Sequence, residues 1–502
     1  MTRSAALSLT LLLVAAPLSA APLPEPNATP TIAPQPATEQ PARAHWALQS
    51  GDAETQRLVD RGLLMLYAFD VGEARVAFAA AVHRDRDLAI GYWGEAEADT
   101  IDINLPDSGP GDVRGAGASA DGRRHLAHAS EVERVLVDAI AKRYAPGTKE
   151  QRFARYASAL SAWTKSHRDD ANVLTIAAYA LWNTDEDLLD KHDAETPKAK
   201  EIGADLDAAL KLEPTNVGAH HLRIHLLEEV KRPQDAVSDA EALESYGYPP
   251  GTSHLEHMPA HIWTRLGEYQ KLVDDNERAV ANDRAWFAEG DGPGQAYMRN
   301  YHDHDVDFVL YGLTTMGRDA DARAFAKNED ALMQTKVALR THEPATALAL
   351  APPSAATLRG IAAARVGNVA AAKAARAKLS DRAASQALID AALAQHAGDV
   401  AGCVAAYQRA YDQTKNDGPG DPKDSWADPI GEGYGAALLA AKKPALAETV
   451  FAAELKRFPN DPRLEFGLAE ALAEQHKDDS APRAAAREHW KGARELTTAD
   501  LG

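Results

Sequence analysis

The segment Phe69–Asp85 reads FDVGEARVAFAAAVHRD, and its spacing of small and apolar residues recurs along the chain. Ala74, Phe78 and Ala81 follow one another at intervals of four and three, the period of one helical face. Two later segments share the spacing, Gly267–Asp283 (GEYQKLVDDNERAVAND) and Lys443–Pro459 (KPALAETVFAAELKRFP). The recurrence predicts a helix that is repeated many times.

This spacing is typical of the second helix of the tetratricopeptide repeat, a helix–turn–helix of about 34 residues. Matching first helices and weaker copies are predicted at Ala89–Thr100, Gln151–Trp182, Thr357–Val366, Ala387–Tyr411 and Arg463–Ala473. Linkers are predicted at 107–122, 285–299 and 416–428, and no run of alternating strands is evident. We therefore expect an all-α fold, a tetratricopeptide-like α-solenoid whose first helices line its concave surface.

Composition excludes several classes of protein. A net charge of −20 over 502 residues argues against a nucleic-acid-binding protein, which needs a basic face. No stretch after the N-terminus approaches the length of a transmembrane helix, so no membrane span is expected. Cys403 is the only cysteine, which excludes an intramolecular disulfide and a cysteine-based zinc cluster.

The chain divides into four predicted parts. Residues 1–20 (MTRSAALSLTLLLVAAPLSA) have the pattern of a secretory signal, which predicts a periplasmic or secreted protein. Residues 21–44 are rich in proline and predict a disordered linker. Residues 45–345 form the predicted N-terminal and central solenoid with histidine-rich helices, and residues 346–502 form the C-terminal repeats.

Histidines are concentrated in the centre of the chain, where two pairs have the same spacing. His221 and His225 lie four residues apart in AHHLRIHLLEE, and His257 and His261 lie four apart in SHLEHMPAHIW. Each pair therefore shares one helical face. Since the second pair follows the first by 36 residues, the two pairs occupy equivalent positions in adjacent repeats, where imidazoles can share an ion.

A third helix is aligned by its turn glycine. Matching Gly267 with Gly317 places His254, His257 and His261 over His304, Asp307 and Tyr311. The predicted metal ligands are His221, His225, His254, His257, His261, His304 and Asp307. Nitrogen and oxygen ligands without sulfur suit a divalent transition metal such as zinc, copper, nickel or iron.

Other interpretations of these residues remain open. Histidines on a concave face can simply be solvated, or can hydrogen-bond buried groups. Asp303 and Asp305 are expected to be solvated or to help at the helix start, and His220 points away from the cluster. Pro259 either lies in the first turn of a helix, where proline is tolerated, or kinks a longer helix and directs His254 toward its neighbour.

Several segments resemble a group of bacterial tetratricopeptide-repeat proteins of poorly defined function. The matching stretches include LYAFDVGEARVAFAAAV, HHLRIHLLEE, HMPAHIWTRLGEY, YHDHDVDFVLYGLTTMGR and DSWADPIGEGYGAALLAAKKPALAETVFAAELKRFPNDPRLEFGLAEAL, and HMPAHI is the most specific. The resemblance extends over most of the mature chain and implies a helical solenoid with His221, His225, His257 and His261 acting as a unit. The sequence departs from the usual pattern at Asp307, where histidine is expected.

Three functions are compatible with the sequence. The first is an exported repeat protein with a metal site on its concave face, whose binding weakens below the ordinary histidine pKa of about 6.5. The second is a metal-dependent hydrolase or oxidoreductase, in which Glu228, three residues after His225, acts as a base or supports a ligand. The third is a metal-free scaffold that binds a protein or peptide partner, preferably a basic one, in its concave groove.

Overall fold

The computed structural model describes residues 44–49, 51–99, 109–184, 187–290, 295–415 and 424–501. These residues are mostly helical, and their only β-structure is one antiparallel bridge between Leu189 and Glu195. The predicted all-α fold is confirmed. The predicted signal sequence and residues 21–43 of the predicted linker lie outside the described residues. None of the described helices is both long and apolar enough to cross a membrane.

The helices follow one another in three groups. The N-terminal helices are α1 (Ala53–Tyr67), α2 (Val71–Arg84), α3 (Ala89–Ala98), α4 (Gly109–Gly122), α5 (Glu131–Arg143), α6 (Lys149–Thr164), α7 (Ala171–Trp182) and α8 (Pro197–Leu212). The central helices are α9 (Val217–Glu229), η1 (Pro233–Ala236), α10 (Val237–Glu244), α11 (Ser253–His257), α12 (Pro259–Leu266), α13 (Tyr269–Ala288), α14 (Gln295–Thr315) and α15 (Asp319–Ala326). The C-terminal helices are α16 (Ala331–Arg340), α17 (Pro344–Leu350), α18 (Ala356–Arg365), α19 (Val369–Ala377), α20 (Ala383–His396), α21 (Val400–Thr414), η2 (Asp424–Ala427), α22 (Ile430–Ala440), α23 (Pro444–Arg457), α24 (Pro462–Ala473), α25 (Ser480–His489) and η3 (Thr498–Asp500).

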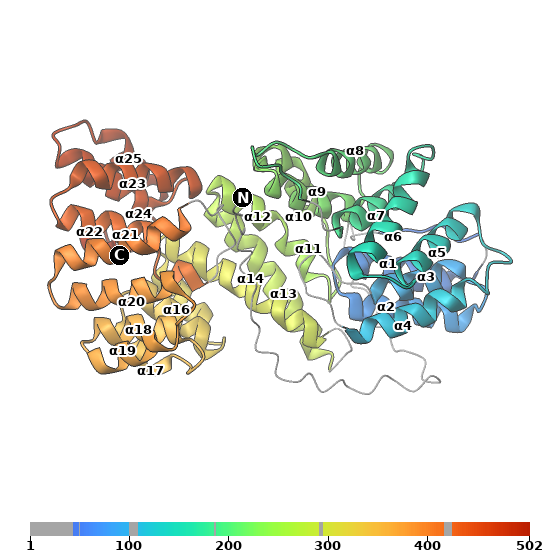
Figure 1. Cartoon of the computed structure of the whole chain (residues 1–502), viewed down its shortest axis with the longest axis horizontal. Coiled ribbons are helices and arrows are strands. Elements are labelled where there is room, and N and C mark those ends of the chain that lie inside the picture. Colours follow the sequence, from blue (N-terminus) through green and yellow to red (C-terminus); the bar gives the residue numbers. More distant parts are fainter. Residues whose placement is uncertain are drawn as a thin grey trace.

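Neighbouring helices pack into hairpins, and the hairpins stack into one elongated array. Consecutive pairs such as α1 and α2, α18 and α19, α20 and α21, and α24 and α25 are in contact along their lengths. Figure 1 shows the array running from α1–α7 through α13 and α14 to α16–α25. Buried residues from all three groups belong to one continuous core, in which many small alanines allow the helices to approach closely.

A residue with positive φ ends the first helix of many hairpins. Gly267 follows α12 with a φ of 73°, and Gly317 follows α14 with a φ of 78°. A glycine with positive φ commonly ends a helix, which agrees with the predicted role of both glycines as turn residues. At the corresponding turn after α1, the positive φ of 59° belongs to Phe69 instead. A bulky residue is unfavourable in this conformation, so its side chain must make contacts that offset the backbone strain.

One predicted linker is wrong. Residues 109–122 form helix α4, although they are rich in glycine. Two of these glycines lie where a larger residue could not fit: a Cβ on Gly115 would fall 2.0 Å from the Tyr144 hydroxyl, and one on Gly122 would fall 2.9 Å from Tyr92 Cβ. Close packing of α4 against its neighbours therefore explains these two glycines. The predicted linker at 285–299 is also too long, because α13 continues to Ala288 and α14 begins at Gln295.

The C-terminal repeats fold back onto the central helices. The Tyr269 hydroxyl donates to Pro459 O over 3.1 Å, and the Lys491 amide donates to Met316 O over 2.7 Å. The guanidinium of the fully buried Arg463 donates to Thr314 O over 2.6 Å. These contacts hold the start of α13 and the end of α14 in place. Helix α14 and the helix before α13, α12, both carry histidines of the candidate site.

Candidate metal centre

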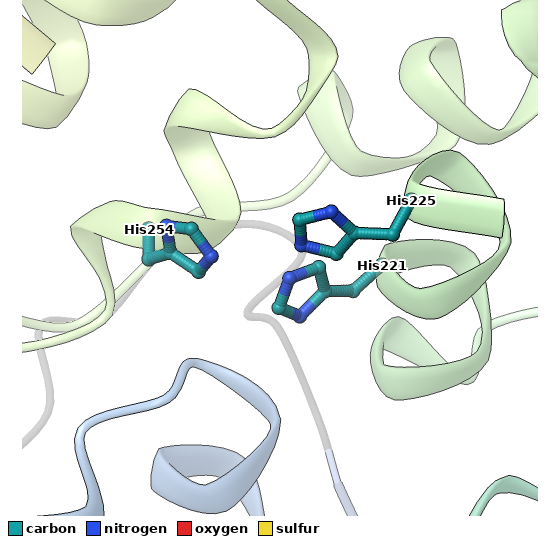
Figure 2. A group of neighbouring side chains, drawn as sticks. All are labelled: His221, His225 and His254. Atoms are coloured by element: carbon teal, nitrogen blue, oxygen red, sulfur yellow. The ribbon is translucent and has the colours of Figure 1, made fainter. Parts of the chain in front are cut away.

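Four helices bring the central histidines together. His221 and His225 lie one turn apart on α9, whose first turn is capped by the Asn216 side chain accepting from the Ala219 amide. His254 and His257 lie on the single turn of α11, His261 lies on α12 and His304 lies on α14. Figure 2 shows the rings of His221 and His225 projecting from one helix toward His254 on the facing helix.

The first triad consists of His221, His225 and His254. One nitrogen from each ring lies within 4.8 Å of the others, and all three residues are buried. Two nitrogens bound to one ion at about 2.0–2.1 Å lie at most about 4.2 Å apart, so small side-chain rotations would bring the triad around a single ion.

The second triad consists of His257, His261 and His304. It meets the same distance condition, and His304 is its one partly exposed member. The ring centroid of His257 lies 4.7 Å from that of His261 and 4.8 Å from that of His304. Six of the seven predicted ligands thus divide into two groups of three, each made of one pair spaced by four and one histidine from a helix farther along the chain.

The orientation of the rings in the second triad follows from their partners. His257 Nδ1 lies 2.7 Å from Asn276 Oδ1, and the Asn276 amide is oriented by donating from Nδ2 to Leu272 O over 2.8 Å. His261 Nδ1 lies 3.2 Å from a carboxylate oxygen of Glu228, which also pairs with Arg265. Because oxygen accepts, both Nδ1 atoms carry the proton, and both Nε2 atoms present a lone pair.

The two Nε2 atoms of His257 and His261 lie 2.9 Å apart. Two acceptor nitrogens cannot hydrogen-bond each other, and their lone pairs repel at this distance. A cation between them, either a proton or a metal ion, removes the conflict. The surroundings of this pair therefore favour a bound cation.

His221 has the same arrangement in the first triad. Its Nδ1 lies 2.6 Å from the backbone oxygen of Tyr67, so Nδ1 carries the proton. Its buried Nε2 makes no hydrogen bond to the part of the chain that the structure describes, and neither ring nitrogen of His254 does. An unsatisfied buried polar atom costs about 1–3 kcal/mol, which coordination to a metal would offset.

Burial also keeps the imidazoles of His221 and His254 neutral. It lowers the pKa of His221 to about 3, despite the hydrogen bond to Tyr67 O. Burial, with the neighbouring histidines His221 and His257, holds the pKa of His254 well below its ordinary value. Neutral rings are the form that binds metals.

Aromatic rings cover both triads. The Phe69 centroid lies 4.5 Å from that of His221 and 5.2 Å from that of His254, which explains why a phenylalanine occupies the strained turn after α1. Phe308 lies 4.7 Å from His257, and Tyr301 lies 4.4 Å from His254. The sequence predicts a site on the concave surface, but these contacts enclose the imidazoles within the helical array.

Asp307 does not belong to either triad. Lys336 Nζ donates to its two carboxylate oxygens over 2.7 and 2.8 Å, and the Trp426 indole donates over 3.0 Å. Tyr311, aligned with it by the repeat, packs against Tyr269 instead. The reason is the rotation of α14: its inward face carries Tyr301, His304, Asp305 and Phe308, whereas Asp307 lies about 60° to the side of His304.

The burial of Asp305 next to the second triad was not predicted from the sequence. Asp305, expected to be solvated, is fully buried, with Oδ1 3.0 Å from His257 Nδ1. Burial and the adjacent carboxyl of Asp283 hold the pKa of Asp305 well above its ordinary value, and burial raises the pKa of Glu256 to about 7. The sequence did contain a signal for this burial, because Tyr301 lies one turn before Asp305 and therefore on the same helical face.

Pro259 is the first residue of α12, so the proline starts a helix. The chain nevertheless stays helical through Met258, with φ −52° and ψ −39°, and α11 forms one separate turn before it. His254 and His257 thus lie on a short helix of their own. The prediction for His220 agrees with the structure: it lies outside both triads, with Nδ1 2.7 Å from Asp239.

Comparison with known proteins adds little to this description. No known family matches the sequence, and no curated protein is similar to it. Among solved structures, the chain matches the tetratricopeptide-repeat domain of P58(IPK) with 12% identity, covering 84% of this chain and 99% of that chain. The TM-score is 0.24, too low to support an argument, so the assignment of the fold rests on the helical hairpins themselves.

Proposed function

We propose that this helical repeat protein binds two divalent transition-metal ions, one in each histidine triad. The single observation that carries the proposal is the pair of Nε2 atoms of His257 and His261, which face each other at 2.9 Å while both Nδ1 atoms are held as donors. The same pattern of one oriented Nδ1 and one available Nε2 at His221 supports an equivalent role for the first triad. Zinc, copper, nickel and iron all suit imidazole ligands.

Metal titration tests this proposal. The full chain, purified without a histidine tag and stripped with a chelator, is expected to bind two ions per molecule. The His257→Ala, His261→Ala protein should retain one ion, and the His221→Ala, His225→Ala protein should retain the other. The control is His83→Ala, which removes an exposed histidine outside both triads and should still bind two.

Two outcomes would contradict the proposal. Wild-type protein that is folded by circular dichroism but binds no metal would mean that the facing nitrogens share a proton. Double variants that bind as much metal as the wild type would place the ions elsewhere. Each variant needs a thermal melt, because removal of a buried ring leaves a cavity that destabilises the protein.

We also propose that the array binds a protein or peptide partner. Stacked helical hairpins present an extended surface, and the net charge of −20 favours a basic partner. Metal binding and partner binding do not exclude each other. Export to the periplasm or medium, proposed from residues 1–20 alone, is tested by the N-terminus of protein recovered from those fractions.

A further inference from the structure

The two triads lie against each other. The His225 ring centroid lies 5.8 Å from that of His261, and the His254 centroid lies 5.7 Å from that of His257. Each of these pairs joins one triad to the other, and His254 and His257 belong to the same turn of α11. Ions held by the two triads would therefore be close neighbours, as in two-metal sites with ions about 3.5–4 Å apart.

The ligand set consists of imidazoles alone. The nearby Glu228 carboxylate and the Asp305 carboxyl group face the Nδ1 side of the rings, where they orient His261 and His257. Among divalent first-row metals, nitrogen sites bind copper most tightly. Three imidazole nitrogens also suit Cu(I), which accepts three-coordinate geometry and needs no anionic ligand. This set thus accommodates both oxidation states of copper.

A small, mostly apolar cavity lies beside the first triad. Its volume is about 30 Å³, and its lining includes Leu63, Phe69, Ile176 and Leu222 together with the polar side chains of His221 and Glu97. This space holds about two molecules the size of water. Because the space is small and its lining is mostly apolar, it favours a diatomic gas over an organic substrate.

We propose that the six histidines form one dinuclear copper centre that binds dioxygen reversibly, an inference that rests on the proposed function. In the binding step each of two Cu(I) ions gives up one electron. Dioxygen accepts both electrons and becomes peroxide bound to two Cu(II) ions. No proton moves and no other bond breaks, so release of dioxygen reverses the step. The cavity beside His221 provides its route of entry.

Oxygen uptake tests the inference. The full chain loaded anaerobically with two equivalents of Cu(I) is expected to take up one dioxygen per two copper ions when air is admitted. The oxygenated protein should be silent in electron paramagnetic resonance, because the spins of two adjacent Cu(II) ions couple. Removal of dioxygen under vacuum should restore the Cu(I) form.

Two variants separate the centre from the cavity. His304→Gln removes a ligand of the second triad only. It should abolish oxygen uptake by the Cu(I) form, and the same variant loaded with Cu(II) instead should give the signal of one isolated Cu(II) ion. At the cavity wall, Ile176→Phe should slow oxygen uptake and Ile176→Ala should speed it, with two coppers still bound in both proteins. Ile176 lies on α7, a helix that contains none of the six histidines.

The outcomes distinguish this inference from the proposed function. A chain that binds no copper, zinc or other metal contradicts both. A chain that binds two metal ions, but whose copper gives the signal of two isolated Cu(II) ions or takes up no dioxygen, overturns the dinuclear centre and leaves metal binding intact. Unchanged uptake rates in both Ile176 variants would overturn the proposed route.

Discussion

At the scale of single residues, Glu228 has the clearest supporting role. Its carboxylate lies 3.2 Å from His261 Nδ1 and pairs with Arg265, so it fixes the ring that directs Nε2 toward His257. The sequence suggested two roles for Glu228, a base or the support of a ligand, and this contact matches the second. A carboxylate behind a metal-binding histidine also increases the basicity of the ring.

Replacement of Glu228 by glutamine should therefore weaken metal binding at the second triad by about 10-fold or more, since loss of such partners typically costs 10–100-fold in affinity. Competition with a chelator of known affinity measures the change. Glu229→Gln is the matched control, because its side chain is exposed on the next position of α9. Equal affinity in the two variants would mean that Glu228 does not orient a ligand.

At the scale of one element, the start of α24 depends on a buried carboxyl. Asp461 caps this helix by accepting from the Arg463 and Leu464 amides over 2.9 and 3.2 Å. Burial raises the pKa of Asp461 to about 7, and the charge of Glu432 adds to this effect. The ionisable groups around it are Glu432, Arg340, Arg463, Tyr311 and Tyr269.

The raised pKa makes stability depend on pH. Between about pH 4 and pH 7 the folded protein keeps a proton on Asp461 that the unfolded chain has lost, so the free energy of unfolding falls as pH rises. Asp461→Asn retains the cap and cannot ionise. Relative to the wild type it should gain stability across this range, by at most about 4 kcal/mol, the free energy that corresponds to a pKa raised by about 3.

Denaturant unfolding at several pH values measures this effect. The control is Asp52→Asn at the exposed cap of α1, where the pKa of Asp52 is lowered to about 2 by the Thr55 amide and Arg84. Stability from Asp52 is present above about pH 4 and lost as pH falls toward 2, so this variant should show no trend between pH 5 and 7. A parallel trend in both variants would contradict the role of Asp461.

At the scale of the whole molecule, bound metal should protect the central helices only. The triads connect α9, α11, α12 and α14, and a ligand present at 100 times its Kd stabilises the folded state by about 2.7 kcal/mol. In a stacked array, each hairpin depends mainly on its neighbours. Hydrogen exchange with and without metal should therefore slow in α9–α14 and stay unchanged in α18–α21. Protection spread evenly over the chain would contradict a central site.

Much of this protein follows from local sequence. The helical period of segments such as Phe69–Asp85 was sufficient to predict stacked hairpins, because each amphipathic helix must bury its face against the next. The spacing of four in each histidine pair, and the offset of 36 residues between pairs, were sufficient to place both pairs in register. These regularities predicted His221, His225, His257 and His261, and the alignment of Gly267 with Gly317 added His254 and His304.

The tertiary structure decided how these histidines divide and what surrounds them. The rotation of α14 about its axis turns His304 and Asp305 inward and directs Asp307 to Lys336. This rotation depends on how α14 packs against its neighbours, so it cannot be derived from the position of a turn glycine alone. The contacts of Phe69 and Tyr67 with His221 join residues about 150 positions apart, which no local pattern encodes. Periodicity determines which residues share a helical face, whereas only the packing of distant helices determines which faces meet.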